Sequence, residues 1–183
     1  IKVLELANNS IGKNSNIAKI FCEALQFNQN IKLLDLNSNN FSDVESSKFL
    51  ASALVSNKFI ENLDLSLNNL GLNLLAANYL SEAFLVNQKL QVLNLSENNL
   101  GERPDIVKNL FEAIGRNKNL RKLNISGNSF GMNSISVRYL VEGLIFNEGI
   151  FELNLSNNLL GNVESLTYLC ALLEKNCAIE ILD

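Results

Sequence analysis

Histidine is absent from this sequence of 183 residues, and so is tryptophan. Without histidine the chain cannot form a Ser-His or Cys-His nucleophile pair, and it cannot form an ordinary zinc site. Carboxylates such as Asp35 and Asp64 could in principle act as an acid and base pair, but an open surface would not desolvate them. We therefore expect no enzymatic activity, no cofactor and no metal ion within these residues.

Cysteine is scarce as well, with only Cys22, Cys170 and Cys177 in the chain. Three cysteines are too few for the disulfide framework of a small secreted domain, so we expect free thiols in a reducing, cytoplasmic compartment. Apolar runs are only a few residues long, far short of the roughly 20 residues needed to cross a bilayer. No charged start followed by an apolar run marks a signal peptide. The sequence thus predicts no membrane partner.

The chain also has no excess of basic residues. The chain has 15 Lys and Arg against 19 Asp and Glu, a formal net charge of -4, and the basic residues are scattered along the sequence. Nucleic-acid binding requires Lys and Arg clustered on one face. We therefore expect neither a nucleic-acid partner nor a small-molecule substrate. The composition, 47% hydrophobic and 19% charged, is typical of a globular protein.

What the chain does contain is an internal repeat. The motif is I/L-x-x-L-x-L-x-x-N followed by one residue and then an apolar residue, with Ile replacing the second Leu in one copy. Six copies start at residues 1, 31, 60, 90, 120 and 150, and a partial copy starts at residue 179. Successive starts are 29 or 30 residues apart, which corresponds to one supersecondary unit per period. We expect a single domain over residues 1–183.

Each unit combines a strand with a helix. The apolar residues of L-x-L lie two apart, so both point to the same side of a strand. The Asn that follows lies at a turn, where its amide can satisfy backbone groups of stacked copies and form a ladder. Apolar pairs four residues apart then predict a helix. We expect Asp43, Asn73 and Ser134 to be helix N-caps and Pro104 to be a first helical residue.

Two further positions recur in every copy. The residue after the turn is glycine in five of six copies, which predicts a left-handed or cramped backbone there. An asparagine stands three residues before each next start, and we expect it to end the helix in the left-handed conformation. The alternative is an asparagine stripe for recognition. These asparagines are Asn28, Asn57, Asn87, Asn117, Asn147 and Asn176.

The motif and its period resemble the leucine-rich repeat family over the whole chain. The length is similar to that of the helix-containing, ribonuclease-inhibitor-like class. This resemblance implies an α/β fold, a leucine-rich-repeat solenoid or horseshoe, with a parallel β-sheet on the concave face and α-helices on the convex face. Strands spaced about 4.8 Å and helices spaced about 8 to 10 Å cannot stack in a straight line, which favours the same bend. We expect the capping units that solenoids need to lie outside these residues.

The expected concave face has a central column of polar residues. Its first three rows carry carboxylates, with Glu61 nearby, and predict an acidic patch that steers a basic partner surface. The alternative is that these residues only solvate the face, because it lacks the Trp, Tyr and Arg typical of binding hot spots. The column is formed by Glu5, Asp35, Asp64, Asn94, Asn124 and Asn154.

Binding elsewhere would use the convex helices or the loops before the helices, where the copies differ most. These loops are residues 13–16, 43–47, 72–75, 102–105, 132–135 and 162–165.

The family resemblance implies a protein–protein interaction module that binds through the concave face or the loops. The sequence pattern L-N-L-S-x-N-N-L-G resembles the repeats of effector proteins that intracellular bacteria such as Legionella inject into host cells. That setting implies the host cytosol and a role in virulence, binding or inhibiting a host protein or another effector. The alternative is a eukaryotic cytosolic domain: an immune-receptor sensor, a Ran GTPase-activating-like domain or a tropomodulin-like regulator.

Overall fold

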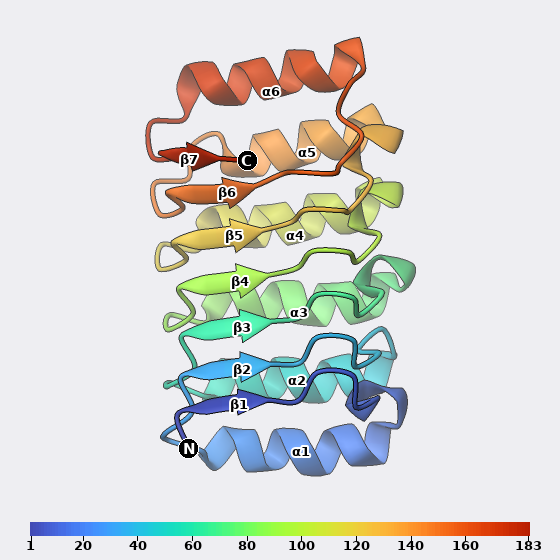
Figure 1. Cartoon of the computed structure of the whole chain (residues 1–183), viewed down its shortest axis with the longest axis vertical. Coiled ribbons are helices and arrows are strands. Elements are labelled where there is room, and N and C mark those ends of the chain that lie inside the picture. Colours follow the sequence, from blue (N-terminus) through green and yellow to red (C-terminus); the bar gives the residue numbers. More distant parts are fainter.

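The chain forms a solenoid of strands and helices that alternate along the sequence (Figure 1). The computed structural model describes all 183 residues. Seven parallel strands form one sheet in sequence order, and the helices stack along one side of it (Figure 1). This arrangement confirms the predicted α/β leucine-rich-repeat solenoid.

The strands are short and the helices have nearly equal lengths. The strands are β1 (Val3–Glu5), β2 (Leu33–Asp35), β3 (Asn62–Asp64), β4 (Val92–Asn94), β5 (Lys122–Asn124), β6 (Glu152–Asn154) and β7 (Ile181–Leu182). The α-helices are α1 (Ser15–Phe27), α2 (Val44–Ser56), α3 (Leu74–Val86), α4 (Pro104–Arg116), α5 (Ser134–Leu144) and α6 (Val163–Lys175). Short 3-10 helices follow four of the strands: η1 (Ile11–Lys13), η2 (Leu70–Leu72), η3 (Leu100–Glu102) and η4 (Phe130–Met132).

The strands pair without any offset between repeats. The central residues Leu34, Leu63 and Leu93 pair in register and are buried, while the residues on either side of each point to the other face of the sheet. The apolar helix faces pack on these leucines and form one continuous core. Each strand therefore presents its first and third residues in columns that run along the solenoid, as the repeat predicts.

An asparagine ladder holds the turns after the strands together, which confirms the sequence prediction. Asn98 is typical: its Oδ1 accepts hydrogen bonds from the backbone N–H groups of Asn68 and Leu70 in the preceding repeat. Its Nδ2 donates to backbone carbonyl oxygens on both repeats, including those of Leu65 and Leu95. Because the ladder asparagines between Asn39 and Asn158 are buried, these amides satisfy backbone groups that water cannot reach.

Four of the five glycines after the turn, Gly12, Gly71, Gly101 and Gly131, are needed for space, and none of the five has a left-handed backbone. A Cβ on Gly131 would lie 2.0 Å from the carbonyl oxygen of Leu159 in the next repeat, so the backbones touch there. The left-handed residues instead flank each ladder asparagine, as Leu67 and Asn69 do with φ values of 56°. The prediction of a left-handed or cramped backbone is therefore confirmed in its second form.

The asparagines near the helix ends form a second ladder. Asn57 has φ -71 and ψ 128, an extended conformation, so the prediction of a left-handed helix end is wrong. Its Nδ2 donates to the carbonyl oxygens of Leu25 and Asn28 in the preceding repeat. Its Oδ1 accepts from the N–H groups of Phe59 and Ile60, in the segment that leads to the next strand. The side chain therefore joins two repeats, since the open carbonyls of one helix end are satisfied by the next repeat.

The helix starts agree with the sequence in all but one detail. Asp43 and Asn73 cap α2 and α3 with their side chains, and Pro104 opens α4. The cap of α5 is Asn133, whose Oδ1 accepts from the N–H of Ile135, so the assignment to Ser134 is wrong by one residue. Asparagine and serine are both favoured N-caps, so residue type alone does not distinguish these two adjacent positions.

Candidate functional site

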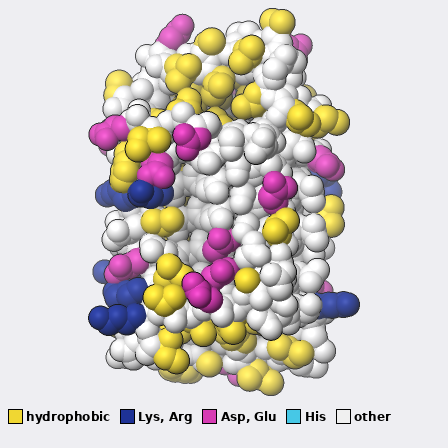
Figure 2. All heavy atoms as spheres, in the orientation of Figure 1, with side chains coloured by type: hydrophobic (Ala, Val, Ile, Leu, Met, Phe, Trp, Pro, Cys, Tyr) yellow, Lys and Arg dark blue, Asp and Glu magenta, His cyan; other side chains and the backbone are white.

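The sheet carries a groove on the side away from the helices. Its volume is about 460 Å³, and it is lined by the outward residues of β1 to β6. Two columns form its floor: the first strand residues, such as Leu33, Val92 and Lys122, and the third strand residues, such as Asp35 and Asp64. We call this surface the concave groove. Figure 2 shows the side of the molecule that carries it, with acidic side chains gathered near its middle and basic ones along one edge.

The structure brings the predicted acidic residues together. Glu5, Asp35 and Asp64 are aligned in one column across β1, β2 and β3, and all three line the concave groove. Glu5 is exposed, and the two aspartates are half-buried. Neighbouring strands lie about 4.8 Å apart, so the three carboxylates stand in consecutive rows.

Each aspartate also supports the turn that follows its strand. The Oδ1 atom of Asp35 accepts from the N–H of Asn37 at 2.8 Å. The Oδ1 atom of Asp64 accepts from both the N–H and the hydroxyl of Ser66, and its Oδ2 atom accepts from Nδ2 of Asn94. These donors are neutral, so they stabilise the carboxylates without cancelling their charge.

The asparagines of the same column have the same structural role. The Oδ1 atoms of Asn94, Asn124 and Asn154 accept from the N–H two residues later, at 3.1, 3.0 and 2.9 Å. They line the concave groove and are half-buried. Since Asn and Asp make the same turn, the turn requires a side-chain oxygen and does not require charge. The negative charge of the first three rows is therefore additional to what the fold needs.

Basic side chains lie near the column but pair with other acids. Lys32 Nζ lies 2.5 Å from Glu61 Oε1, and Lys122 Nζ lies 2.5 Å from Glu152 Oε2. Glu61 thus pairs beside the sheet and does not line the concave groove, so the structure separates it from the other predicted site residues. The carboxylates of the column itself have no cation within 4 Å, which leaves their charge uncompensated.

Apolar residues of the groove were not among the predicted site residues. Val3, Leu33 and Val92 belong to the column of first strand residues, next to the acidic column. Leu33 and Val92 line the groove and are half-buried, and Val3 is exposed. The strand alternation already placed them on this face, and their apolar character was the available signal.

The loops before the helices are mostly occupied by helix caps. One of them carries an exposed ion pair, in which Arg103 donates two hydrogen bonds to Asp105. The hydrogen bond from Arg103 lowers the pKa of Asp105 below its ordinary value. This pair is solvent-screened and stabilises the start of α4 only weakly.

The remaining chemistry-bearing side chains form no cluster. Burial raises the pKa of the Cys22 thiol from 9.0 to about 12, so this thiol is poorly reactive, while Cys170 and Cys177 are exposed. No group of three or more Cys, Asp or Glu side chains is arranged to hold a metal ion. None of the helices is long and apolar enough to cross a lipid bilayer.

Comparisons with known proteins agree with this architecture. A family model described as Leucine Rich Repeat matches residues 89–110 and 119–140. The C-terminal domain of tropomodulin from Caenorhabditis elegans superposes with a TM-score of 0.66 and 17% identity, over 86% of this chain and 92% of that one. Actin-binding site 2 of leiomodin-1 matches with a TM-score of 0.47 and 18% identity, over 95% and 79% of the two chains.

The fold and the groove together define the class of this molecule: a leucine-rich-repeat solenoid with an open, polar sheet face. The similarity to tropomodulin shows the fold, at an identity too low to carry a partner across. No curated protein matches the sequence. None of these matches supports the resemblance to bacterial effectors.

Proposed function

We propose that the protein is a binding module, without catalytic activity, that holds a protein partner with a basic surface in the concave groove. The observation that carries this proposal is the uncompensated acidic column of Glu5, Asp35 and Asp64 on the floor of that groove. Three aligned charges without cation partners create a negative potential that attracts a basic surface and orients it as it approaches.

The fold supports this reading in a second way. Nearly every other repeated residue is accounted for by the core, the two asparagine ladders or the turns. The acidic rows differ from the later rows of the same column, where asparagine makes the same turn. Carboxylates at Asp35 and Asp64 therefore add charge where the architecture does not demand it, and apolar Leu33 lies beside them in the groove.

Affinity capture with matched variants tests the proposal. The double variant Asp35→Asn/Asp64→Asn keeps the turn hydrogen bonds, because Asn94 and Asn124 make them in later repeats. The control Glu23→Gln/Glu82→Gln removes two exposed charges from the helices and leaves the groove intact. We expect proteins with basic surfaces to be retained by the wild type and the control and lost by the double variant. Retention by all three proteins, or by none, would refute the groove as the binding surface.

The cellular setting is a separate part of the proposal. We infer a reducing, cytoplasmic compartment, since the chain has three free cysteines and Cys22 is buried as an inert thiol. A eukaryotic regulator related in fold to tropomodulin is the setting that the structural similarity favours. No observation favours the alternative of a bacterial effector in the host cytosol. Capture from a eukaryotic lysate beside capture from a bacterial effector library distinguishes the two.

A further inference from the structure

The array of helices contains one irregular place, between α4 and α5. Two residues before the helix-end asparagine, the other repeats carry larger side chains, whereas the α4 repeat carries Gly115. Four residues before that asparagine, three successive repeats carry buried alanines such as Ala83 and Ala113, whereas the α5 repeat carries Gly143. The side chains at the first of these positions are those of Gln26, Val55, Leu85, Ile145 and Glu174.

The two glycines let the helix backbones touch. A Cβ on Gly115 would lie 2.0 Å from the carbonyl oxygen of Gly143, and a Cβ on Gly143 would lie 2.4 Å from the carbonyl oxygen of Phe111. Contacts this short cannot accommodate any side chain without backbone movement. Beside this backbone contact, residues of α4 and α5 line a depression on the outer surface.

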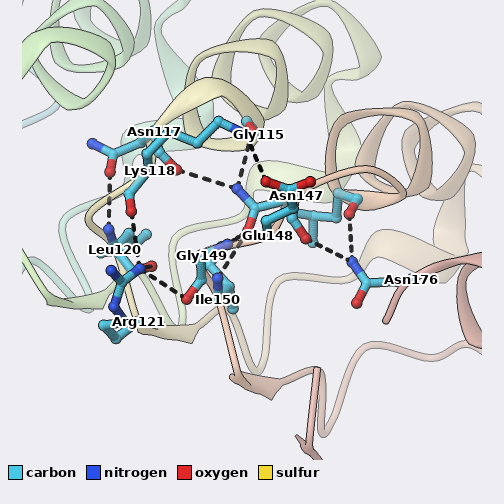
Figure 3. A network of polar contacts seen from close by, with 11 residues as sticks. Gly115, Asn117, Lys118, Leu120, Arg121, Asn147, Glu148, Gly149, Ile150 and Asn176 are labelled. Atoms are coloured by element: carbon cyan, nitrogen blue, oxygen red, sulfur yellow. Dashed lines mark hydrogen bonds and ion pairs between the residues drawn. The ribbon is translucent and has the colours of Figure 1, made fainter. Parts of the chain in front are cut away.

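The helix-end ladder changes at the same place (Figure 3). Asn147 Nδ2 donates to the carbonyl oxygen of Gly115, two residues before Asn117. In the other repeats the acceptor lies three residues before the helix-end asparagine of the preceding repeat. For example, Nδ2 of Asn87 donates to the carbonyl oxygen of Leu54, three residues before Asn57. The helix α5 also ends earlier than the others, after 11 residues instead of 13. The exposed residue Phe146, which follows the end of α5, lines the depression.

We call this depression the convex groove. It has a volume of about 330 Å³ and is lined by Gly115, Arg116, Tyr139, Phe146 and their neighbours on α4 and α5. The Phe146 side chain is 77% exposed. Tyr139 is half-buried, with the guanidinium of Arg138 4.9 Å from its ring centroid. Tyr and Arg are enriched in binding hot spots, and Phe is enriched at interfaces in general. The concave groove lacks all three.

Around the convex groove, more basic side chains than acidic ones lack an ion-pair partner. Arg138 pairs with Glu142 at 3.5 Å. Lys108 and Arg116 are exposed and have no carboxylate within 4 Å, so they outnumber the single unpaired acid, Glu112. An apolar side chain that fills the depression therefore has on its flanks two cations without carboxylate partners. One of them, Lys108, also lies over the Tyr139 ring, 5.8 Å from its centroid.

We propose that the convex groove is a second docking site, separate from the concave groove, for a partner protein segment with a large apolar side chain beside a carboxylate. The apolar side chain occupies the depression between α4 and α5 and packs on Phe146. The carboxylate pairs with Arg116 or Lys108. Burial of both ends excludes water from a small, preformed pocket, which is the arrangement that gives a single anchor residue most of the binding energy.

The sequence offers a matched control for the test. Phe27 occupies the same repeat position as Phe146 and is similarly exposed, at 82% against 77%. It has no glycine groove beside it. Serine is tolerated at this position, since Ser56 occupies it at the end of α2. Phe146→Ser, Arg116→Ser and Phe27→Ser should therefore all fold, which circular dichroism verifies.

The experiment is a selection of random 12-residue peptides displayed on phage against the immobilised whole chain, followed by fluorescence anisotropy with the enriched peptides. We expect peptides that carry an aromatic or aliphatic residue next to Asp or Glu. Their affinity should fall at least about tenfold in Phe146→Ser and Arg116→Ser and change less than about twofold in Phe27→Ser.

Several results would overturn the second docking site. The first is a selection that enriches no peptide, and the second is enriched peptides that lack an acidic or an apolar residue. The third is a peptide affinity that Phe146→Ser leaves unchanged, or that Phe27→Ser lowers by as much as Phe146→Ser does. Peptides lost only in Asp35→Asn/Asp64→Asn would bind in the concave groove, which would support the proposed function and refute the convex site. The two proposals therefore fail independently.

Discussion

Removal of one rung of the asparagine ladder should cost several kcal/mol of stability. Asn98→Ala removes the only acceptor of two buried backbone N–H groups, those of Asn68 and Leu70. Each buried donor left without a partner costs about 1 to 3 kcal/mol, so the two together cost about 2 to 6 kcal/mol. The carbonyl oxygens that Asn98 serves each keep a second donor and add little. Those oxygens belong to Leu65, Leu95 and Ser96.

Asn9→Ala is the matched control for this prediction. Asn9 occupies the same repeat position, but it is exposed and its Oδ1 accepts no hydrogen bond from the protein. Its replacement should cost less than about 1 kcal/mol. Urea unfolding, followed by circular dichroism and by hydrogen exchange of the Leu70 amide, measures both variants. If Asn98→Ala and Asn9→Ala lost equal stability, the ladder would not be a main source of cohesion between repeats.

Three further predictions concern stability and thiol chemistry. Gly131→Ala should destabilise the protein by about 1 to 3 kcal/mol because its Cβ meets the next repeat. The control Gly161→Ala has open space around it and should change stability by less than about 1 kcal/mol. A thermal melt measures both variants. Cys170 and Cys177 should react quickly with a thiol reagent and Cys22 only on unfolding; equal rates for all three would contradict the burial of Cys22. Since the pKa of Cys22 is raised from 9.0 to about 12, its contribution to stability is complete below pH 9 and lost as the pH rises toward 12. A Cys22→Ala variant should lack this alkaline loss.

The regular parts of this molecule could be predicted from the sequence because they depend on short-range patterns. The L-x-L pairs fix which strand residues face the core, and equal repeat lengths fix the register, so the column of Asp35, Asp64 and Asn94 follows directly. Likewise, the invariant turn asparagine predicts a ladder, because its amide can both donate to and accept from the backbone of a stacked copy.

The errors have a common physical origin in contacts between repeats. The helix-end position of Asn57 suggests a left-handed cap when a single repeat is considered, but its amide bonds Leu25, 32 residues away. Gly131 leaves a left-handed and a cramped backbone open, and its contact with a carbonyl of the next repeat decides for the cramped one. The pairing of Glu61 with Lys32 also depends on side-chain direction at the start of the strand, which the alternation pattern does not specify.

The convex groove shows why irregular positions matter in a repeat protein. Gly115 and Gly143 are unremarkable in a single repeat, and their effect appears only when α4 and α5 are packed together. In a solenoid, each repeat contacts mainly its neighbours, so a local substitution reshapes one groove and leaves the rest of the array intact. Binding specificity can therefore differ between the two faces of the same chain.

The central claim is that the acidic column of the concave groove attracts the partner, and its most direct test is the association rate. The partner from the capture experiment is measured by surface plasmon resonance at several ionic strengths. We predict that Asp35→Asn/Asp64→Asn slows association by about three- to tenfold at low salt and flattens its salt dependence, while Glu23→Gln/Glu82→Gln leaves both unchanged. Equal association rates and equal salt dependence for the wild type and the Asp35→Asn/Asp64→Asn variant would contradict the claim.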